Sequence, residues 1–178
     1  MDYRANDDWK SSRPLDLCFL GTTSPHRARF FARNADQINR YESFLYLRTG
    51  NATEPMNTAI DEVKLVDVAQ YVARNSRVLL NIHRDEFPYF EWHRLVYQGM
   101  VNGCTIVSEP CFANPEYKPG VHYLAEESHR LMDLLEWVLN DADGKAKASS
   151  VAAAGGAMAR NPVNQEARAN ALIDLLMS

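Results

Sequence analysis

The chain has 178 residues, which is enough for one domain with a core of its own. Hydrophobic residues make up 46% and charged residues 24%, as in soluble globular domains, and no apolar run is long enough to span a membrane. The net charge of −4 excludes a strongly basic protein of the kind that binds nucleic acid or anionic membranes. Three cysteines without a C-x-x-C pair, and a polar N-terminus unlike a signal peptide, favour a reduced, cytoplasmic setting.

The first half of the chain alternates apolar runs with amphipathic segments. Residues 1–13 lack periodicity and are expected to form a tail or interdomain linker. Ser24 is a good N-cap and Pro25 a good first helical residue, so a helix is expected to begin there. The elements expected in this half are a strand at 15–21, a helix at 24–39, a strand at 43–50, a loop at 51–61 and a helix at 62–76.

The second half repeats this alternation and then becomes helical. The pair Gly155-Gly156 is expected to interrupt an alanine-rich helix, and residues 161–178 are expected to form a last helix that packs on the domain or on a missing N-terminal half. The expected elements are strands at 77–82, 105–109 and 120–125, and helices at 90–103, 128–141, 144–161 and 161–178.

This order of elements predicts an α/β fold. The strands are continuous apolar runs without polar alternation, as expected when both faces of a parallel sheet are covered by helices. We therefore expect one Rossmann-like domain over residues 14–160, with about five parallel strands and helices on both faces. In such sheets, ligands bind beyond the carboxyl ends of the strands, where the strand order reverses.

The first candidate site is the loop GTTSPHR, residues 21–27. Gly21 permits a tight turn, while Thr22, Thr23 and Ser24 place hydroxyls and backbone donors beside a helix N-terminus, where an anion is stabilised. Arg27 lies in the first turn of that helix and could hold a phosphate through two hydrogen bonds. An ordinary capped helix start would explain the same residues, because the loop lacks a recognised phosphate-binding signature.

The second candidate site follows the strand at 77–82. On a helix that begins near Phe90, the side chains of Glu91, Arg94 and Gln98 would form one polar stripe at the mouth of the crevice. The alternative is a surface Glu–Arg pair of small energetic value. Among the aromatic residues of this segment, Phe90 and Trp92 are expected in the core.

Other motifs give little support for different chemistry. The acidic run at 141–143 is explained better by turn and cap chemistry than by metal binding. The histidines have no recognised metal-ligand spacing, so no metal is expected. Nothing in the sequence supports a hydrolase triad.

The segment RVLLNIHRDEFPYFEWHRLVYQGMVNGCTIVSEPCF resembles the C-terminal half of GT-B glycosyltransferases, and most closely the family 4-like and spore-maturation-like branch. In that branch a strand ends in LN-(I/L)-H, a helix carries E-x-x-R, and an NG turn leads to a strand that ends in VVSE. The corresponding residues here are Leu80 to His83, Glu91 to Arg94, Asn102-Gly103 and Val107 to Glu109. The resemblance covers roughly residues 15–140.

The resemblance implies a domain that binds a nucleoside diphosphate sugar without a metal ion or other cofactor. The diphosphate would lie at the first loop and helix start, where Gly21, Thr22, Ser24 and Arg27 match the family. Arg27 would stabilise the leaving diphosphate, and Glu91 would orient sugar hydroxyls.

The resemblance also implies contacts with the nucleobase and ribose. These fall to His83 and to the polar stripe that includes Arg94 and Gln98, and Glu109 is a further candidate for a sugar or ribose contact. Many relatives carry a second glutamate eight residues after the first. This chain has Gln98 near that place, only seven residues after Glu91.

The leading hypothesis is therefore the donor-binding domain of a glycosyltransferase. Its partner would be an N-terminal acceptor-binding domain or a separate chain, because GT-B enzymes have two domains of similar size. The alternative from another class is a degenerate, non-catalytic binding or interaction module, which the glutamine at position 98 would suit. A different Rossmann-like phosphoryl-ligand protein, such as a sensor domain, has no motif support.

Overall fold

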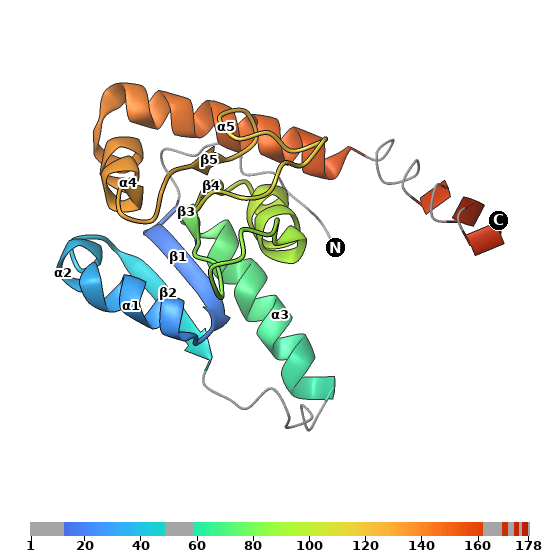
Figure 1. Cartoon of the computed structure of the whole chain (residues 1–178), viewed down its shortest axis with the longest axis horizontal. Coiled ribbons are helices and arrows are strands. Elements are labelled where there is room, and N and C mark those ends of the chain that lie inside the picture. The colour runs from blue at the N-terminus through green and yellow to red at the C-terminus, as the bar shows by residue number, and fades with distance from the viewer. Residues whose placement is uncertain (1–12, 49–58, 162–168, 171–172, 175, 178) are drawn as a thin grey trace.

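One parallel sheet of five strands forms the centre of the protein (Figure 1). The computed structural model describes residues 13–48, 59–161, 169–170, 173–174 and 176–177. The strand order is β2-β1-β3-β4-β5, and every neighbouring pair is parallel. The strands are β1 (Leu15–Thr22), β2 (Ser43–Arg48), β3 (Ser76–Asn81), β4 (Thr105–Ser108) and β5 (Leu124–Ala125).

Helices cover both faces of this sheet, which confirms the predicted Rossmann-like α/β class. Figure 1 shows α1, α2 and α4 on one side of β1 and α3 on the other, with α5 running along the β5 end of the sheet. The helices are α1 (Pro25–Arg33), α2 (Ala35–Ile38), α3 (Ala59–Arg74), η1 (His93–Gly99), η2 (Met100–Asn102), α4 (Leu131–Asn140) and α5 (Ala142–Arg160).

The core consists of two clusters, one on each face of the sheet. Along β1, Leu17 and Phe19 belong to the cluster under α1 and α4, while Cys18 and Leu20 belong to the cluster under α3 and η1. This alternation explains why the four buried residues 17–20 are all apolar: consecutive side chains point to opposite faces, and both faces are buried. Burial of apolar surface on both sides is therefore what fixes the sheet between its helices.

The segment after β3 differs most from its prediction. The sequence pattern predicts an α-helix over 90–103, but η1 is a π-helix and η2 a turn of 3₁₀-helix. The spacing of apolar residues cannot by itself distinguish a π-helix or a 3₁₀-helix from an α-helix. π-Helical turns are frequent at functional sites. The helix predicted over 24–39 is likewise divided, at Asn34, into α1 and α2.

Helix α5 is continuous, so the predicted interruption at Gly155-Gly156 is wrong. Both glycines are buried, and a Cβ atom on Gly155 would lie 2.6 Å from the carbonyl oxygen of His122 and 3.2 Å from the Cγ atom of Met100. The missing side chain at this position therefore allows α5 to approach the chain before β5 and η2 closely. Here glycine serves packing between elements and does not end the helix.

Several other expectations can be compared with the described residues. Arg13 falls within the predicted tail, but it is buried and donates to the carbonyl oxygens of Ser76 and Asn102 at 2.6 and 2.9 Å. The rest of the tail predicted over 1–13, and most of the expected loop at 51–61 and last helix at 161–178, lie outside the described residues. Residues 59–61 belong to α3, so the loop predicted there is wrong. The strand expected at 120–125 is reduced to β5, because a turn at Gly120 precedes it.

Among the described residues, no helix has the length and apolar character needed to cross a membrane.

We expect Gly155→Ala to lower the free energy of unfolding by about 1–3 kcal/mol, as overpacking does in a tight core. Helix propensity alone predicts the opposite sign, since alanine is favoured over glycine by about 1 kcal/mol. Urea denaturation followed by circular dichroism measures the change. Ala153→Gly on the exposed side of α5 is the control, because there propensity should dominate. An unchanged or higher stability of Gly155→Ala would mean that α5 is not held closely at this point.

Candidate functional site

A cavity of about 340 Å³ lies at the carboxyl edge of the sheet. The strand order reverses between β1 and β3, which is the place where ligands bind in doubly wound sheets. Parts of β1, β2, α1 and α3 line the cavity, together with the segment that follows β3. The lining residues are Leu20, Gly21, Thr22, Arg27, Tyr46, Arg48, Ala69, Arg84, Tyr89, Glu91, His93, Arg94 and Gln98.

Arg27 projects from the first turn of α1 to the base of this cavity and is almost fully buried, with 1% of its surface exposed. Its Nε donates to the carbonyl oxygen of Ile82 at 2.9 Å, and its Nη1 donates to the carbonyl and hydroxyl oxygens of Thr22 at 3.0 and 3.3 Å. Its Nη2 donates to Oε1 of Glu91 at 3.1 Å. Every guanidinium nitrogen of Arg27 thus contacts a protein acceptor, and the residue ties α1 to the ends of β1 and β3.

Glu91 is the shared partner of two arginines. Its Oε1 accepts from Arg27, and its Oε2 lies 2.9 Å from Nη1 of Arg94, although at an angle outside ordinary hydrogen-bond geometry. All three side chains are at least nine-tenths buried. The alternative of an exposed Glu–Arg pair is therefore wrong. Burial lowers the pKa of Arg94 to about 10 and also lowers the pKa of Arg27, and the carboxylate of Glu91 opposes both shifts.

The ring of Phe19 supports both guanidinium groups from β1. Their Cζ atoms lie 5.3 and 5.2 Å from the ring centroid, within the range of cation–π attraction. Gly21 lies beside the same ring, and a Cβ atom there would be 2.9 Å from Cζ of Phe19 and 3.0 Å from Nη2 of Arg94. Gly21 lies within β1, paired with Leu47, so the tight turn expected at this glycine is wrong. Its missing side chain instead leaves room for an arginine that comes from the other side of the cavity.

The start of α1 has the predicted cap. The hydroxyl of Ser24 accepts from the backbone N–H of Arg27 at 3.1 Å, and Pro25 follows the cap. Thr23 donates to the carbonyl oxygen of Arg48 through its backbone N–H at 2.9 Å and through its hydroxyl at 3.1 Å. Thr23 and Ser24 therefore hold the loop in place, and neither lines the cavity.

Glu109 belongs to a second polar group at the same edge, made with two histidines. Its Oε1 lies 2.8 Å from Nε2 of His26, and its Oε2 accepts from the backbone N–H of His83 at 2.7 Å. Nε2 of His83 is 2.9 Å from the carbonyl oxygen of Pro110, while its Nδ1 is buried and has no hydrogen-bond partner in the described part of the chain. This group connects α1 with the ends of β3 and β4 and stands outside the cavity lining.

The structure thus separates the predicted site residues into two sets. Those that line the cavity are Gly21, Thr22, Arg27, Glu91, Arg94 and Gln98, and those that lie beside it are Thr23, Ser24, His83 and Glu109. Phe90 and Trp92 pack against the core as expected, and Asp141 caps α5 by accepting from the backbone N–H groups of residues 143 and 144.

Sequence reasoning missed the contribution of β2 and α3 to the cavity. Tyr46 and Arg48 come from the edge strand and Ala69 from α3. No motif marks them, but the position of Arg48 as the last residue of β2 is a signal, because the carboxyl ends of parallel strands meet at one edge.

Arg84, Tyr89 and His93 also line the cavity. They belong to the charged and aromatic segment after β3, and nothing in the sequence singles out any one of them as a cavity residue.

The lining has an excess of positive charge. The described residues that line the cavity include four arginines, Arg27, Arg48, Arg84 and Arg94, and one carboxylate, that of Glu91. Within the described part of the chain, no group of three or more His, Cys, Asp or Glu side chains is arranged to hold a metal ion. The cavity therefore favours an anionic ligand.

Comparison with known proteins shows similarity of fold. No family model matches the chain, and no curated protein matches it. Among solved structures, HepE from Anabaena in complex with UDP and glucose superposes with a TM-score of 0.52 at 14% sequence identity. The match covers 84% of this chain and 44% of the HepE chain, so the protein spans less than half the length of this neighbour.

We expect Glu91→Gln to lower the free energy of unfolding by about 3–5 kcal/mol, because it leaves two buried guanidinium groups without their shared counter-ion. Chemical denaturation at pH 7 measures the loss. Glu127→Gln is the control, since Glu127 is exposed and its substitution should change stability by about 0.5 kcal/mol or less. Equal stability of the two variants would show that the buried charges are not held by Glu91.

Proposed function

We propose that the cavity binds a nucleoside diphosphate sugar and that the chain is the donor-binding domain of a glycosyltransferase. The observation that carries the proposal is the arginine-rich cavity at the point where the strand order reverses. Its positive wall suits a diphosphate, and the rings of Tyr46 and Tyr89 at the same cavity suit a nucleobase or sugar face. The fold similarity to HepE, solved with UDP and glucose, supports the same ligand class.

In this proposal the buried residues prepare the cavity for the donor. Glu91 is fixed by two arginines, yet each carboxylate oxygen retains a lone pair that can accept from a sugar hydroxyl. Gln98, on the same wall, can donate to or accept from a ribose hydroxyl. Positive charge at the diphosphate would stabilise the leaving group as the glycosidic bond to it breaks. An acceptor domain or partner chain would supply the rest of the enzyme.

A non-catalytic binding module is the second candidate. The observation that favours it is the engagement of both Glu91 oxygens by buried arginines, which suits a structural role for this carboxylate. Release of glucose from UDP-glucose by the purified chain would favour the transferase, since donor hydrolysis is the reaction with water as acceptor. Tight binding without any turnover, also in the presence of candidate acceptors, would favour the module.

Calorimetric titration with UDP, GDP and ADP tests the proposal. We expect one nucleotide to bind with sub-millimolar affinity, about 4 kcal/mol or better. Arg84→Ala should weaken that binding by about threefold or more, because it removes an exposed cation from the cavity wall without disturbing the core.

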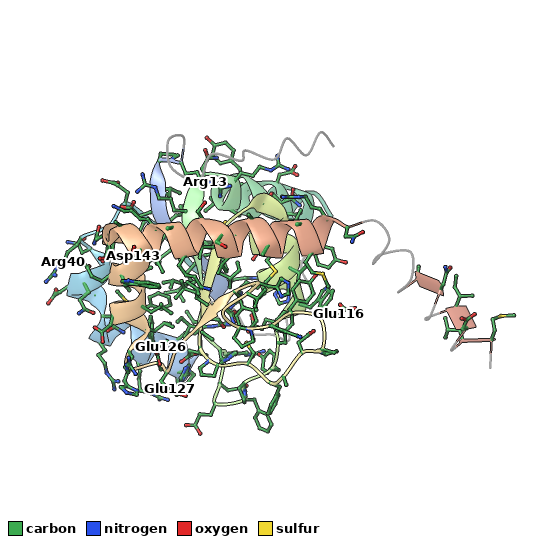
Figure 2. The ribbon with its side chains drawn as sticks, turned by 90° about the horizontal axis from the view of Figure 1, so that it is seen from above. Arg13, Arg40, Glu116, Glu126, Glu127 and Asp143 are labelled. Atoms are coloured by element: carbon green, nitrogen blue, oxygen red, sulfur yellow. The ribbon has the colours of Figure 1, made fainter. Side chains whose placement is uncertain are left out.

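The matched control is Arg40→Ala. Arg40 is also exposed, and Figure 2 shows it at the edge of the molecule, next to the helices α1 and α2. Its removal should leave the affinity unchanged. If no nucleotide binds, or if both variants lose the same affinity, the cavity is not a nucleotide site.

A further inference from the structure

The two buried arginines at the base of the cavity differ in how many of their donors the protein uses. Arg27 directs Nε, Nη1 and Nη2 to acceptors at 2.9 to 3.3 Å, and these acceptors belong to Ile82, Thr22 and Glu91. A phosphate could contact Arg27 with two hydrogen bonds only by displacing these groups, and a displaced buried carbonyl loses its partner at a cost. Arg27 is thus already committed to the fold.

Arg94 is equally buried but poorly satisfied. Its short contact is from Nη1 to Glu91, and the same nitrogen lies 3.4 Å from Oδ1 of Asn81 and from the carbonyl oxygen of Ile82. Its Nε is buried without a hydrogen-bond partner, and Nη2 has no acceptor among the described residues. Buried guanidinium donors are normally paired, so this edge of Arg94 is suited to an acceptor from outside the chain.

The position of Arg94 agrees with this interpretation. Its Nη2 lies next to Gly21, where a Cβ atom would approach it to 3.0 Å, and both residues line the cavity. The glycine thereby leaves the guanidinium edge open toward the loop between β1 and α1. A ligand oxygen at that loop would meet Arg94 from the cavity side.

The charge balance points the same way. Two buried guanidinium groups share one carboxylate, that of Glu91, which leaves one positive charge uncompensated at the base of the cavity. Glu109, another carboxylate at this edge of the sheet, is engaged by His26 and by the backbone N–H of His83. An uncompensated buried charge is costly, and a bound anion would remove that cost.

We propose that Arg94 is the residue that binds the diphosphate of the ligand, through its Nη2 edge beside Gly21, and that Arg27 is a positioning residue that fixes Glu91, which in turn holds Arg94. This inference rests on the proposed nucleotide site and reverses the roles that the sequence gives to the two arginines. The ligand group recognised by Arg94 is a pyrophosphate, whatever base or sugar is attached to it.

The test uses inorganic pyrophosphate, UDP and uridine as probes, with calorimetry for affinity and thermal unfolding for stability. Arg94→Met should weaken binding of pyrophosphate and UDP by about tenfold or more, because a bidentate contact is lost. It should lower the thermal midpoint less than Arg27→Met does, because Arg27 also holds the carbonyl oxygens of Ile82 and Thr22 at 2.9 and 3.0 Å, whereas the hydrogen bonds of Arg94 to Asn81 and Ile82 are 3.4 Å long. Arg40→Met is the control for both measurements.

Arg94→Lys keeps the buried charge, and it replaces Arg94→Met in the binding measurement if Arg94→Met does not fold. A lysine presents a single ammonium group in place of a planar fork, so pyrophosphate affinity should still fall by about threefold or more. A folded Arg94→Met or Arg94→Lys protein that binds pyrophosphate as tightly as the wild type overturns the inference. A larger loss of thermal stability for Arg94→Met than for Arg27→Met also overturns it.

The probes separate this inference from the proposed function. Pyrophosphate binding that depends on Arg94, without tighter binding of any nucleoside diphosphate, supports the arginine assignment and contradicts the nucleotide-sugar site. Nucleotide binding that is independent of Arg94 supports the nucleotide-sugar site and contradicts the arginine assignment. If the wild type binds neither pyrophosphate nor UDP, both proposals fail.

Discussion

The buried ion cluster of Arg27, Glu91 and Arg94 is the interaction on which the carboxyl edge of the sheet depends. It joins α1, the end of β3 and the π-helix η1 at a point where no strand pairing connects them. Buried ions are stable only when paired and hydrogen-bonded, so the loops that carry them have little freedom. The cavity thus owes its shape to electrostatics at its base as much as to the apolar clusters on either side of the sheet.

The position of the cluster follows from the order of the strands. The chain goes from β1 outward to β2 and then returns through the connecting helix α3 to β3, which lies on the other side of β1. The segments after β1 and β3 diverge at this reversal, and side chains from both line the space between them. Arg94 and Gln98, four residues apart on η1, both line the cavity, as the stripe expected on an α-helix also would.

The sequence was sufficient for the strands β1 to β4 and for the caps of α1 and α5. Continuous apolar runs predict β1, β3 and β4 because both faces are buried, and Ser24 predicts the start of α1 because its hydroxyl satisfies a free N–H. The cavity could be predicted only in part. Gly21, Glu91 and Arg94 stand in recognisable segments, but Tyr46 and Ala69 reach the cavity through tertiary packing. Apolar spacing also could not reveal that η1 is a π-helix or that Gly155 serves close packing.

Helix α5 has a consequence for the order in which the protein can fold. Its first half contributes Ala148 and Val151 to one core cluster and its end contributes Ala159 to the other, so it seals both. Figure 2 shows α5 crossing the whole width of the domain, with Arg13 on one side of it and Glu127 on the other. During synthesis, residues 15–125 can pair as strands, yet both apolar layers stay partly open to water until residue 160 has left the ribosome. We therefore expect the two apolar layers to be completed together, and only after α5 has been synthesised.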